Sequence, residues 1–208
     1  VFCSLAKNLE LDNKIPKKNY KKTVNAIKRY FKISIDIKSS ELFIFATAAV
    51  REAVNGNDLK NEIEKITGSE MIVLSENDEV HLSSQGLLSS FPSANGIMAD
   101  LGGGSLELSL IKDGKIEEFV SLKIGVVRFL NNYLKNKKSC IKKISKLLNS
   151  INWLQKNKGM NLYAIGGSFR SLAKVHIWTK KYPLSLIQGY TINKNEINEL
   201  IDLSSNIK

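Results

Sequence analysis

The chain has 208 residues, 43% of them hydrophobic and 25% charged, and carries a formal net charge of +11. This length and apolar content suffice for one full core or two small domains, which excludes a disordered or fibrous chain. Its two cysteines, Cys3 and Cys140, lie far apart without a ligand cluster, which excludes a disulfide framework and a zinc site. No apolar run reaches the roughly 18 residues of a membrane span, and the first residues lack the pattern of a signal peptide. We therefore expect a globular, cytoplasmic protein with no membrane partner.

The positive charge is unevenly distributed along the chain. Segment 119–195 contains 15 Lys and Arg residues and no Asp or Glu, whereas the rest of the chain carries a small excess of acidic residues. A field of this sign attracts polyanions such as nucleic acid, polyphosphate or an anionic membrane. A solvated lysine-rich surface is the equally weighted alternative.

The first half of the chain alternates helices with short apolar strands. Helices are expected at 16–31, 57–67 and 76–89, and buried strands at 42–47 and 71–74. Pro16 suits the first turn of a helix, and Gly68 is a helix stop signal. This order is typical of a parallel sheet covered by helices, and the following segment 92–96 is interpreted as a linker.

Beyond the linker the pattern changes to a β-meander followed by helices. Strands are expected at 97–100, 106–111, 116–122 and 162–165, and helices at 141–154, after 168 and after 193. Asp113 and Gly114 form a type I′ hairpin signal, and Asn193 with Glu196 forms an N-cap pair. The sequence therefore predicts two domains, 1–92 and 93–208.

Three consecutive glycines follow Asp100 in the turn between two of these strands. A Walker A or dinucleotide loop requires a following helix, so both are excluded here. Glycines lack a Cβ atom, and successive backbone N–H groups can therefore face one anion such as phosphate. Asp100 suits a hydrated Mg²⁺, and Ser105 can donate a further hydrogen bond. A glycine-rich hairpin without a ligand is the alternative.

At these residues the sequence resembles the exopolyphosphatase and guanosine pentaphosphate phosphatase family, whose hairpin reads Asp-Ile-Gly-Gly-Gly-Ser-Thr-Glu. Further motifs of that family match in the same order at Ala46–Ala53, Val73–Leu82, Gly125–Arg128 and Gly166–Ala173. The resemblance implies an α/β fold of two ribonuclease-H-like domains, as in the actin, sugar kinase and heat-shock ATPase superfamily. Phosphates would lie in the cleft between these two domains.

The resemblance also assigns roles to individual residues. Glu79 corresponds to the catalytic glutamate that orients or deprotonates the attacking water. Asp100 is expected to act in catalysis and, with Glu107, to bind the Mg²⁺ cofactor; from the strand pattern alone, Glu107 faces either the cleft or solvent. Phosphate contacts are expected from Arg51, Gly102, Gly103, Gly104, Ser105, Glu107, Arg128, Gly166, Gly167, Ser168 and Arg170. For Arg128 and Arg170, structural pairing is the alternative.

The chain departs from the family pattern at several positions. Ala48, Leu106 and His81 replace the family's serine, threonine and arginine, but no catalytic carboxylate is lost. The family's first phosphate hairpin, of the type Asp-x-Gly-Ser-Asn-Ser, is expected to precede Val1 and to be missing from this chain, as are the closing C-terminal helices.

Two functions follow from these residues. The first is an exopolyphosphatase, which hydrolyses the terminal phosphoanhydride bond of inorganic polyphosphate or removes the 5′-phosphate of guanosine pentaphosphate by Mg²⁺-assisted attack of water. The second is a non-catalytic protein that binds polyphosphate or a nucleotide. Nucleic acid is disfavoured as a partner because the lysine cluster lacks interleaved aromatic residues. A homodimer and the preferred phosphate substrate are left open.

Overall fold

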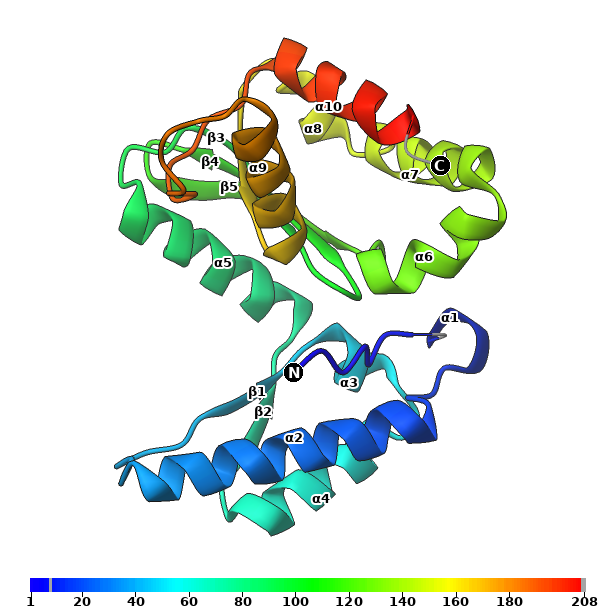
Figure 1. Cartoon of the computed structure of the whole chain (residues 1–208), viewed down its shortest axis with the longest axis vertical. Helices are drawn as coiled ribbons and strands as arrows, with labels where there is room; N and C mark the ends of the chain where they lie inside the picture. The colour runs from blue at the N-terminus through cyan, green and yellow to red at the C-terminus, as the bar shows by residue number, and fades with distance from the viewer. Residues whose placement is uncertain (8, 207–208) are drawn as a thin grey trace. The chain divides into compact units, whose positions relative to one another are not determined.

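The computed structural model describes residues 1–7 and 9–206 (Figure 1). It contains two compact units, Val1–Ala164 (unit 1) and Ile165–Lys208 (unit 2), and each is described by itself. The described strands form a two-stranded sheet before residue 92 and a four-stranded sheet after it. The domain boundary expected at residue 92 stays a prediction, because the compact units divide elsewhere.

The first part of unit 1 alternates helices and strands, as the sequence predicted. Its elements are α1 (Leu9–Asp12), α2 (Lys17–Asp36), β1 (Ile44–Ala46), α3 (Ala48–Glu52), α4 (Gly56–Thr67), β2 (Met71–Val73) and α5 (Glu76–Ser90). β1 and β2 pair in parallel, with Ile44 opposite Met71. Gly68 ends α4 in the left-handed region at φ +66°, which confirms the stop signal.

One face of the β1–β2 sheet is covered by α2 and α4, which lie side by side in Figure 1. Val24, Leu59, Ile63, Ile44 and Met71 form the buried cluster between these elements. The described residues leave the other face uncovered, since the Phe45 and Ile72 side chains are 55% and 40% exposed. The buried strand predicted at 42–47 is therefore buried on one face only, because an apolar run does not determine how many faces of a sheet are covered.

The second part of unit 1 is an antiparallel meander followed by helices and one further strand. The meander consists of β3 (Gly96–Leu101), β4 (Leu106–Lys112) and β5 (Lys115–Leu122). Strand β6 (Asn161–Ile165) joins the same sheet beside β3, in the spatial order β5-β4-β3-β6. Asp113 and Gly114 have φ values of +49° and +70°, and these two positive angles confirm the predicted hairpin turn. Helix α5 packs on this sheet, where the hydroxyls of Ser84 and Ser109 lie 2.9 Å apart.

Three helices lie between β5 and β6: α6 (Val126–Lys135), α7 (Lys137–Asn149) and α8 (Asn152–Lys156). The single helix expected at 141–154 is therefore divided into two. Ile144 and Leu147 pack partly against the cluster around Phe129, whereas Ile141 is 48% exposed. The apolar stripe thus belongs only in part to the core.

Unit 2 contains α9 (Gly167–Thr179) and α10 (Lys194–Asn206). The predicted N-cap pair is present at the start of α10: the Asn193 side chain accepts the Glu196 N–H at 3.1 Å, and the Glu196 carboxylate accepts the Asn193 N–H at 2.8 Å. His176 is buried, and its Nδ1 lies 2.8 Å from the Tyr190 hydroxyl. None of the helices in the described ranges has both the length and the apolar character needed to cross a bilayer.

Candidate active site

The first turn of α5 holds Glu79 in a defined position. Ser75 caps this helix: its hydroxyl accepts the Asp78 N–H at 3.1 Å, while the Asp78 carboxylate accepts the Ser75 N–H at 3.0 Å. Such a capping box fixes both the start and the rotation of a helix. Glu79 follows directly, and its carboxylate accepts hydrogen bonds from the Ala48 N–H and the Arg51 guanidinium.

Arg51 ties together three elements around this carboxylate. It comes from α3, and its Nη1 donates to the Leu74 carbonyl just beyond β2 at 2.6 Å and to Glu79 on α5. The Arg51 and Glu79 side chains are only 20% and 11% exposed. Burial raises the pKa of Glu79, and the Asp100 charge adds to this rise, while Arg51 and the Ala48 N–H oppose it. Glu79 therefore retains its proton to a higher pH than an ordinary glutamate.

Asp100 and Glu107 lie beside each other on the four-stranded sheet. They are directly opposite one another in the β3–β4 register, and Glu107 is in turn opposite Ser121 on β5. The Ser121 hydroxyl donates to Glu107 at 3.0 Å, and the Ser83 hydroxyl donates to Asp100 at 2.7 Å. Because Ser83 stands one helical turn after Glu79 on α5, this face of the sheet meets the side of α5 that carries Glu79.

Glu107 is 3% exposed, so its side chain does not face solvent, which was one of the two orientations left open by the strand pattern. Burial raises its pKa, and the charges of Glu79 and Asp100 add to the rise, while hydroxyls of Ser105 and Ser121 oppose it. The three carboxylates are thus close enough to repel one another. The single donor proton of the Ser105 hydroxyl is directed at Glu107, whereas the sequence predicted a hydrogen bond to phosphate.

The glycine hairpin leaves backbone donors without acceptors. The Gly102 N–H closes the turn by donating to the Ser105 carbonyl at 3.0 Å. The carbonyls of Gly102 and Gly103 accept N–H groups from the first turn of α6 at 3.0 to 3.1 Å. Within the described residues, the N–H groups of Gly103 and Gly104 meet no protein acceptor. Two adjacent unpaired amides beside three carboxylates are therefore available to an anion.

Close packing explains why this loop needs glycine. A Cβ atom on Gly104 would lie 3.3 Å from the Ala48 Cβ, and one on Gly103 would lie 3.3 Å from a Val127 methyl group. At Gly125, which packs against the hairpin, a Cβ atom would lie 2.2 Å from the Gly103 carbonyl oxygen. The absence of side chains thus lets α3 and α6 press against the hairpin and fix its backbone.

Arg128 links the glycine hairpin to Glu52 at the end of α3. Its Nε donates to the Gly104 carbonyl at 2.7 Å, and its Nη2 donates to the Glu52 carboxylate at 3.0 Å. Lys123 lies 3.4 Å from the same carboxylate. Of the two alternatives for Arg128, the structure thus shows structural pairing, with an acid 76 residues away in the chain. A contact between Arg128 and phosphate stays a prediction.

The remaining predicted site residues lie in unit 2. Gly166 is the N-cap residue of α9, with φ +103°, and Gly167 and Ser168 open the helix. Arg170 is exposed in the first turn of α9. Because unit 2 is described by itself, the phosphate contacts expected from these residues stay predictions.

Three contributors to the site were missed by the sequence analysis. Ser83 was visible in principle, because it stands four residues after Glu79 on the same helix face. Ser121 follows from the hairpin register, which places it opposite Glu107. Glu52 gave no signal, because its pairing with Arg128 arises only when distant elements meet.

The carboxylates match a magnesium site in which the protein supplies only one or two of the ligands. In the described ranges no group of three His, Cys, Asp or Glu residues is placed to hold a metal. Mg²⁺ usually takes only one or two protein carboxylates and fills its other positions with water and substrate phosphate. Asp100 and Glu107 repel each other; Asp100 accepts the Ser83 hydroxyl and Glu107 accepts those of Ser105 and Ser121, which leaves lone pairs for a cation. These residues therefore fit such an ion.

An α/β unit in which acidic side chains, an arginine and a glycine hairpin converge is the arrangement expected of a protein that transfers phosphoryl groups. The chain belongs to the Ppx/GppA phosphatase family, since the sequence model of that family matches residues 2–208. The resemblance found in the sequence is thereby confirmed, and a phosphatase class of activity follows for the family.

Curated relatives carry different names. Exopolyphosphatase 1 of Mycobacterium leprae is 33% identical over 173 residues, which cover 78% of this chain and 51% of the relative. Retrograde regulation protein 2 of Saccharomyces cerevisiae is 26% identical over 209 residues, which cover 90% of this chain and 36% of the relative. The chain thus spans about half the length of the first relative and about a third of the second.

The crystal structure of the Aquifex aeolicus member of the family is similar throughout the chain. Its TM-score is 0.72 at 21% identity, and the match covers 99% of this chain and 68% of that chain. At this identity the similarity shows the fold alone. The predicted α/β fold class is confirmed.

Proposed function

We propose that this chain supplies the catalytic site of an exopolyphosphatase-type hydrolase, which releases the terminal phosphate of inorganic polyphosphate or the 5′-phosphate of guanosine pentaphosphate. The observation that carries the proposal is the convergence of Glu79, Asp100 and Glu107 beside the two unpaired amides of Gly103 and Gly104. Family membership supports the phosphatase class. Among the relatives, one is named exopolyphosphatase 1 and another guanosine-5'-triphosphate,3'-diphosphate pyrophosphatase.

Glu79 is the proposed general base. Its carboxylate accepts a proton as the water oxygen attacks the terminal phosphorus atom, and the bond from that phosphorus to the bridging oxygen breaks. The departing phosphate chain keeps the electron pair of the broken bond. A pKa raised by burial makes Glu79 a stronger base than a solvated glutamate, and Arg51 holds its carboxylate in one orientation.

The hairpin amides are the proposed anion contacts. The transferring phosphoryl group carries charge on its equatorial oxygens, which fixed N–H donors stabilise without having to reorganise. Gly103 and Gly104 present such donors, and Arg128 holds their loop through the Gly104 carbonyl. A bound Mg²⁺, held by Asp100 and Glu107, would neutralise part of the charge on the phosphoryl group.

A non-catalytic phosphate-binding protein is the second candidate. It is favoured by one observation, namely that the matched relative from Saccharomyces cerevisiae is named as a regulation protein rather than as a hydrolase. In that case the unpaired amides would hold a phosphate that is never attacked. The two candidates differ in turnover and not in the residues that bind the ligand.

Phosphate release separates the two candidates. The protein that contains this chain would be assayed with long-chain polyphosphate and with guanosine pentaphosphate, in Mg²⁺ and in EDTA, beside its Glu79→Gln variant. We expect metal-dependent release that falls by about 10²- to 10⁴-fold in the variant, the range typical for loss of a general base. Binding of both substrates without release would establish the non-catalytic candidate, and an unaffected variant would remove Glu79 from its role.

A further inference from the structure

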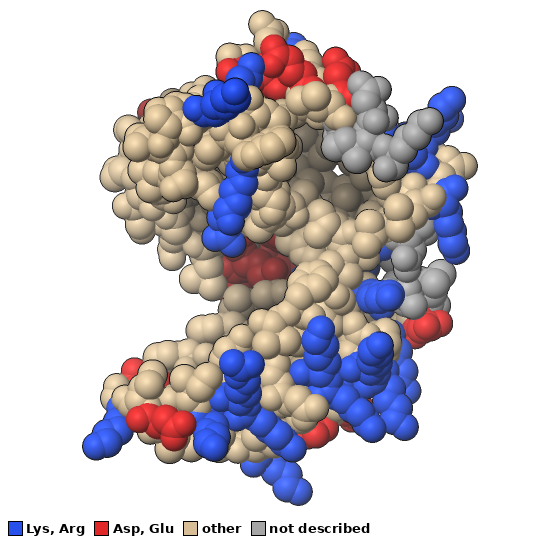
Figure 2. Space-filling view, viewed as in Figure 1, with Lys and Arg blue, Asp and Glu red and all other residues tan. Residues whose placement is uncertain are grey.

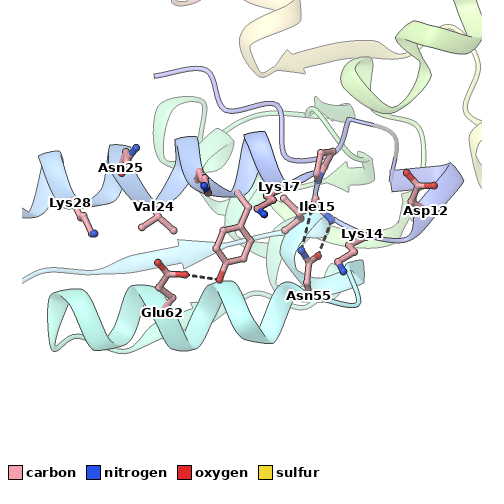
Figure 3. A pocket seen from close by; sticks show the side chains of 12 residues that line it. Asp12, Lys14, Ile15, Lys17, Val24, Asn25, Lys28, Asn55 and Glu62 are labelled. Atoms are coloured by element: carbon pink, nitrogen blue, oxygen red, sulfur yellow. Dashed lines mark hydrogen bonds between the residues drawn. The ribbon is translucent and has the colours of Figure 1, made fainter.

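A cavity of about 800 Å³ opens on unit 1 between the α1–α2 connection, α2 and α4 (Figure 3). It is lined by Asp12, Lys14, Ile15, Pro16, Lys17, Tyr20, Lys21, Val24, Asn25, Lys28, Asn55 and Glu62. None of these residues belongs to the candidate active site. The cavity is large enough for a ligand of about the size of a nucleotide or a short polymer segment.

Four lysines, Lys14, Lys17, Lys21 and Lys28, border the cavity and are here called the lysine row. The last three recur at helical spacing along one edge of α2, so Lys17 and Lys28 are separated by about 16 Å of helix axis. All four side chains are exposed. In the part of the chain that the structure describes, none of the four forms an ion pair.

Among the described residues of the lining, two acids oppose this positive charge, and one of them already accepts a hydrogen bond. The Tyr20 hydroxyl donates to the Glu62 carboxylate at 2.9 Å. Burial raises the pKa of Tyr20 to about 12, and Glu62 adds to the rise, so this hydroxyl stays protonated and keeps donating. The other acid, Asp12, lies on α1. Four lysines against two carboxylates make the described lining of the cavity positive.

The cavity is held open by the fold. The Asn55 Oδ1 accepts the Ile15 N–H at 2.8 Å, and the Asn55 Nδ2 donates to the Ile15 carbonyl at 3.1 Å (Figure 3). Both residues are buried, so this pair fixes the α1–α2 connection against the start of α4. Val24 lies on the floor. A site of this kind is formed before its ligand arrives.

We propose that this cavity is a second binding site for a linear chain of phosphoryl groups, separate in its residues from the candidate active site. A row of cations about 16 Å long is too extended for one phosphate and matches the repeated charge of a linear polyanion. The choice of inorganic polyphosphate among such polyanions rests on the proposed function, whereas the anion site itself does not.

Nucleic acid fits the cavity less well. Binding of single strands depends on aromatic rings on which successive bases stack. Among the described residues of the lining, Tyr20 is the one aromatic residue, and its hydroxyl donates to Glu62. A chain without bases needs only the cations. Attachment at this site would hold a long polyphosphate on the protein between encounters with the active site and so raise the effective concentration of its free end.

The test compares two triple variants of α2 in the protein that contains this chain. The cavity variant is Lys17→Gln/Lys21→Gln/Lys28→Gln. The matched control is Lys18→Gln/Lys22→Gln/Lys32→Gln, which removes the same charge from exposed positions of the same helix outside the cavity. Glutamine preserves helix propensity, so both variants should fold. Binding of long-chain inorganic polyphosphate is measured over a series of salt concentrations, with single-stranded DNA as a second probe.

We expect the cavity variant to bind long-chain polyphosphate at least about tenfold more weakly at low salt, with the slope of log K against log salt reduced by about 2 to 3. The control should stay within about twofold of the unmodified protein. Equal effects of the two variants would overturn the site, because charge alone would then explain binding. A larger loss for DNA than for polyphosphate would overturn the choice of ligand.

Phosphate release is measured on the same samples, so that this inference and the proposed function can fail independently. Lysine-dependent binding in a protein that releases no phosphate would support the second site and contradict the proposed hydrolase function. Phosphate release with no difference in binding between the two variants would support the hydrolase function and contradict the second site.

Discussion

In the candidate active site the charged groups have partners inside the protein, whereas the lysine row beside the cavity faces solvent. Glu79 is paired with Arg51, and Asp100 and Glu107 each accept a serine hydroxyl. Figure 2 shows Lys and Arg side chains gathered over the part of unit 1 that contains α2 and α4. The partnered groups have fixed positions, and burial raises the pKa values of Glu79 and Glu107, while exposed lysines keep rotamer freedom and suit a mobile polyanion.

The largest expected effect is the loss of phosphate release when the Glu79 carboxylate is replaced. Glu79→Gln should lower phosphate release by about 10²- to 10⁴-fold, because the general base is lost while the shape of the side chain is kept. Glu76→Gln, an exposed glutamate in the same turn of α5, is the matched control and should leave the rate within about twofold. Steady-state kinetics on both variants checks this contrast. Equal losses would point to damage of the α5 cap instead.

Arg128→Met should destabilise the folded protein by about 3 kcal/mol, because it removes the donor to the Gly104 carbonyl and the buried partner of the Glu52 carboxylate, which keeps the exposed Lys123. Chemical denaturation measures this change in the free energy of unfolding. The double variant Arg128→Met/Glu52→Leu should lose less than the sum of the two single changes, since it removes both members of the pair. Additive losses would show that the two residues act independently.

Gly125→Ala should cost about 1 to 3 kcal/mol, because the new Cβ atom would lie 2.2 Å from the Gly103 carbonyl oxygen and the hairpin would have to move. Gly86→Ala is the control: this residue lies within α5 and has open space around it, so the change should stabilise the protein by up to about 1 kcal/mol. Thermal unfolding of both variants checks the opposite signs.

The raised pKa values of Glu79 and Glu107 predict that activity and stability respond oppositely to pH. Between the ordinary value of 4.5 and each raised value, the folded protein binds more protons than the unfolded chain, so stability contributed by these groups falls as the pH rises. Activity rises over the same range because Glu79 must lose its proton. Arg51→Gln removes the cation that opposes the shift and should move the acid limb of the kcat/KM profile to higher pH.

The lysine row should contribute least to folding. Each of its exposed lysines lacks a partner in the described residues, so substitution by glutamine should change the free energy of unfolding by no more than about 0.5 kcal/mol. The same substitutions are expected to weaken polyphosphate binding. A large loss of stability would show that these lysines serve the fold, and the contrast with the active site would disappear.

Much of the local structure was predictable from the residues. The Ser75–Leu82 segment carries its own helix start, Asp113 and Gly114 specify their turn, and the helix-strand alternation before residue 92 follows from apolar periodicity. The lysine row was not predicted, because the charge count depends on the length of the segment that is counted. Residues 14–32 contain eight basic residues and no acid, whereas residues 1–118 taken together contain 15 basic and 17 acidic residues, so the local excess disappears in the longer count.

The sequence by itself determined most of the elements, the glycine hairpin and the identity of the candidate catalytic residues, because these depend on local conformation and on motifs that are contiguous in the chain; α3 and α6 were not predicted. Only the tertiary structure decided what those residues touch. The partners of Glu79, Arg128 and Glu107 are 28, 76 and 14 residues away. Burial, which shifts the pKa values, depends on which faces of the elements are covered, and covering is a property of the packed fold rather than of any segment.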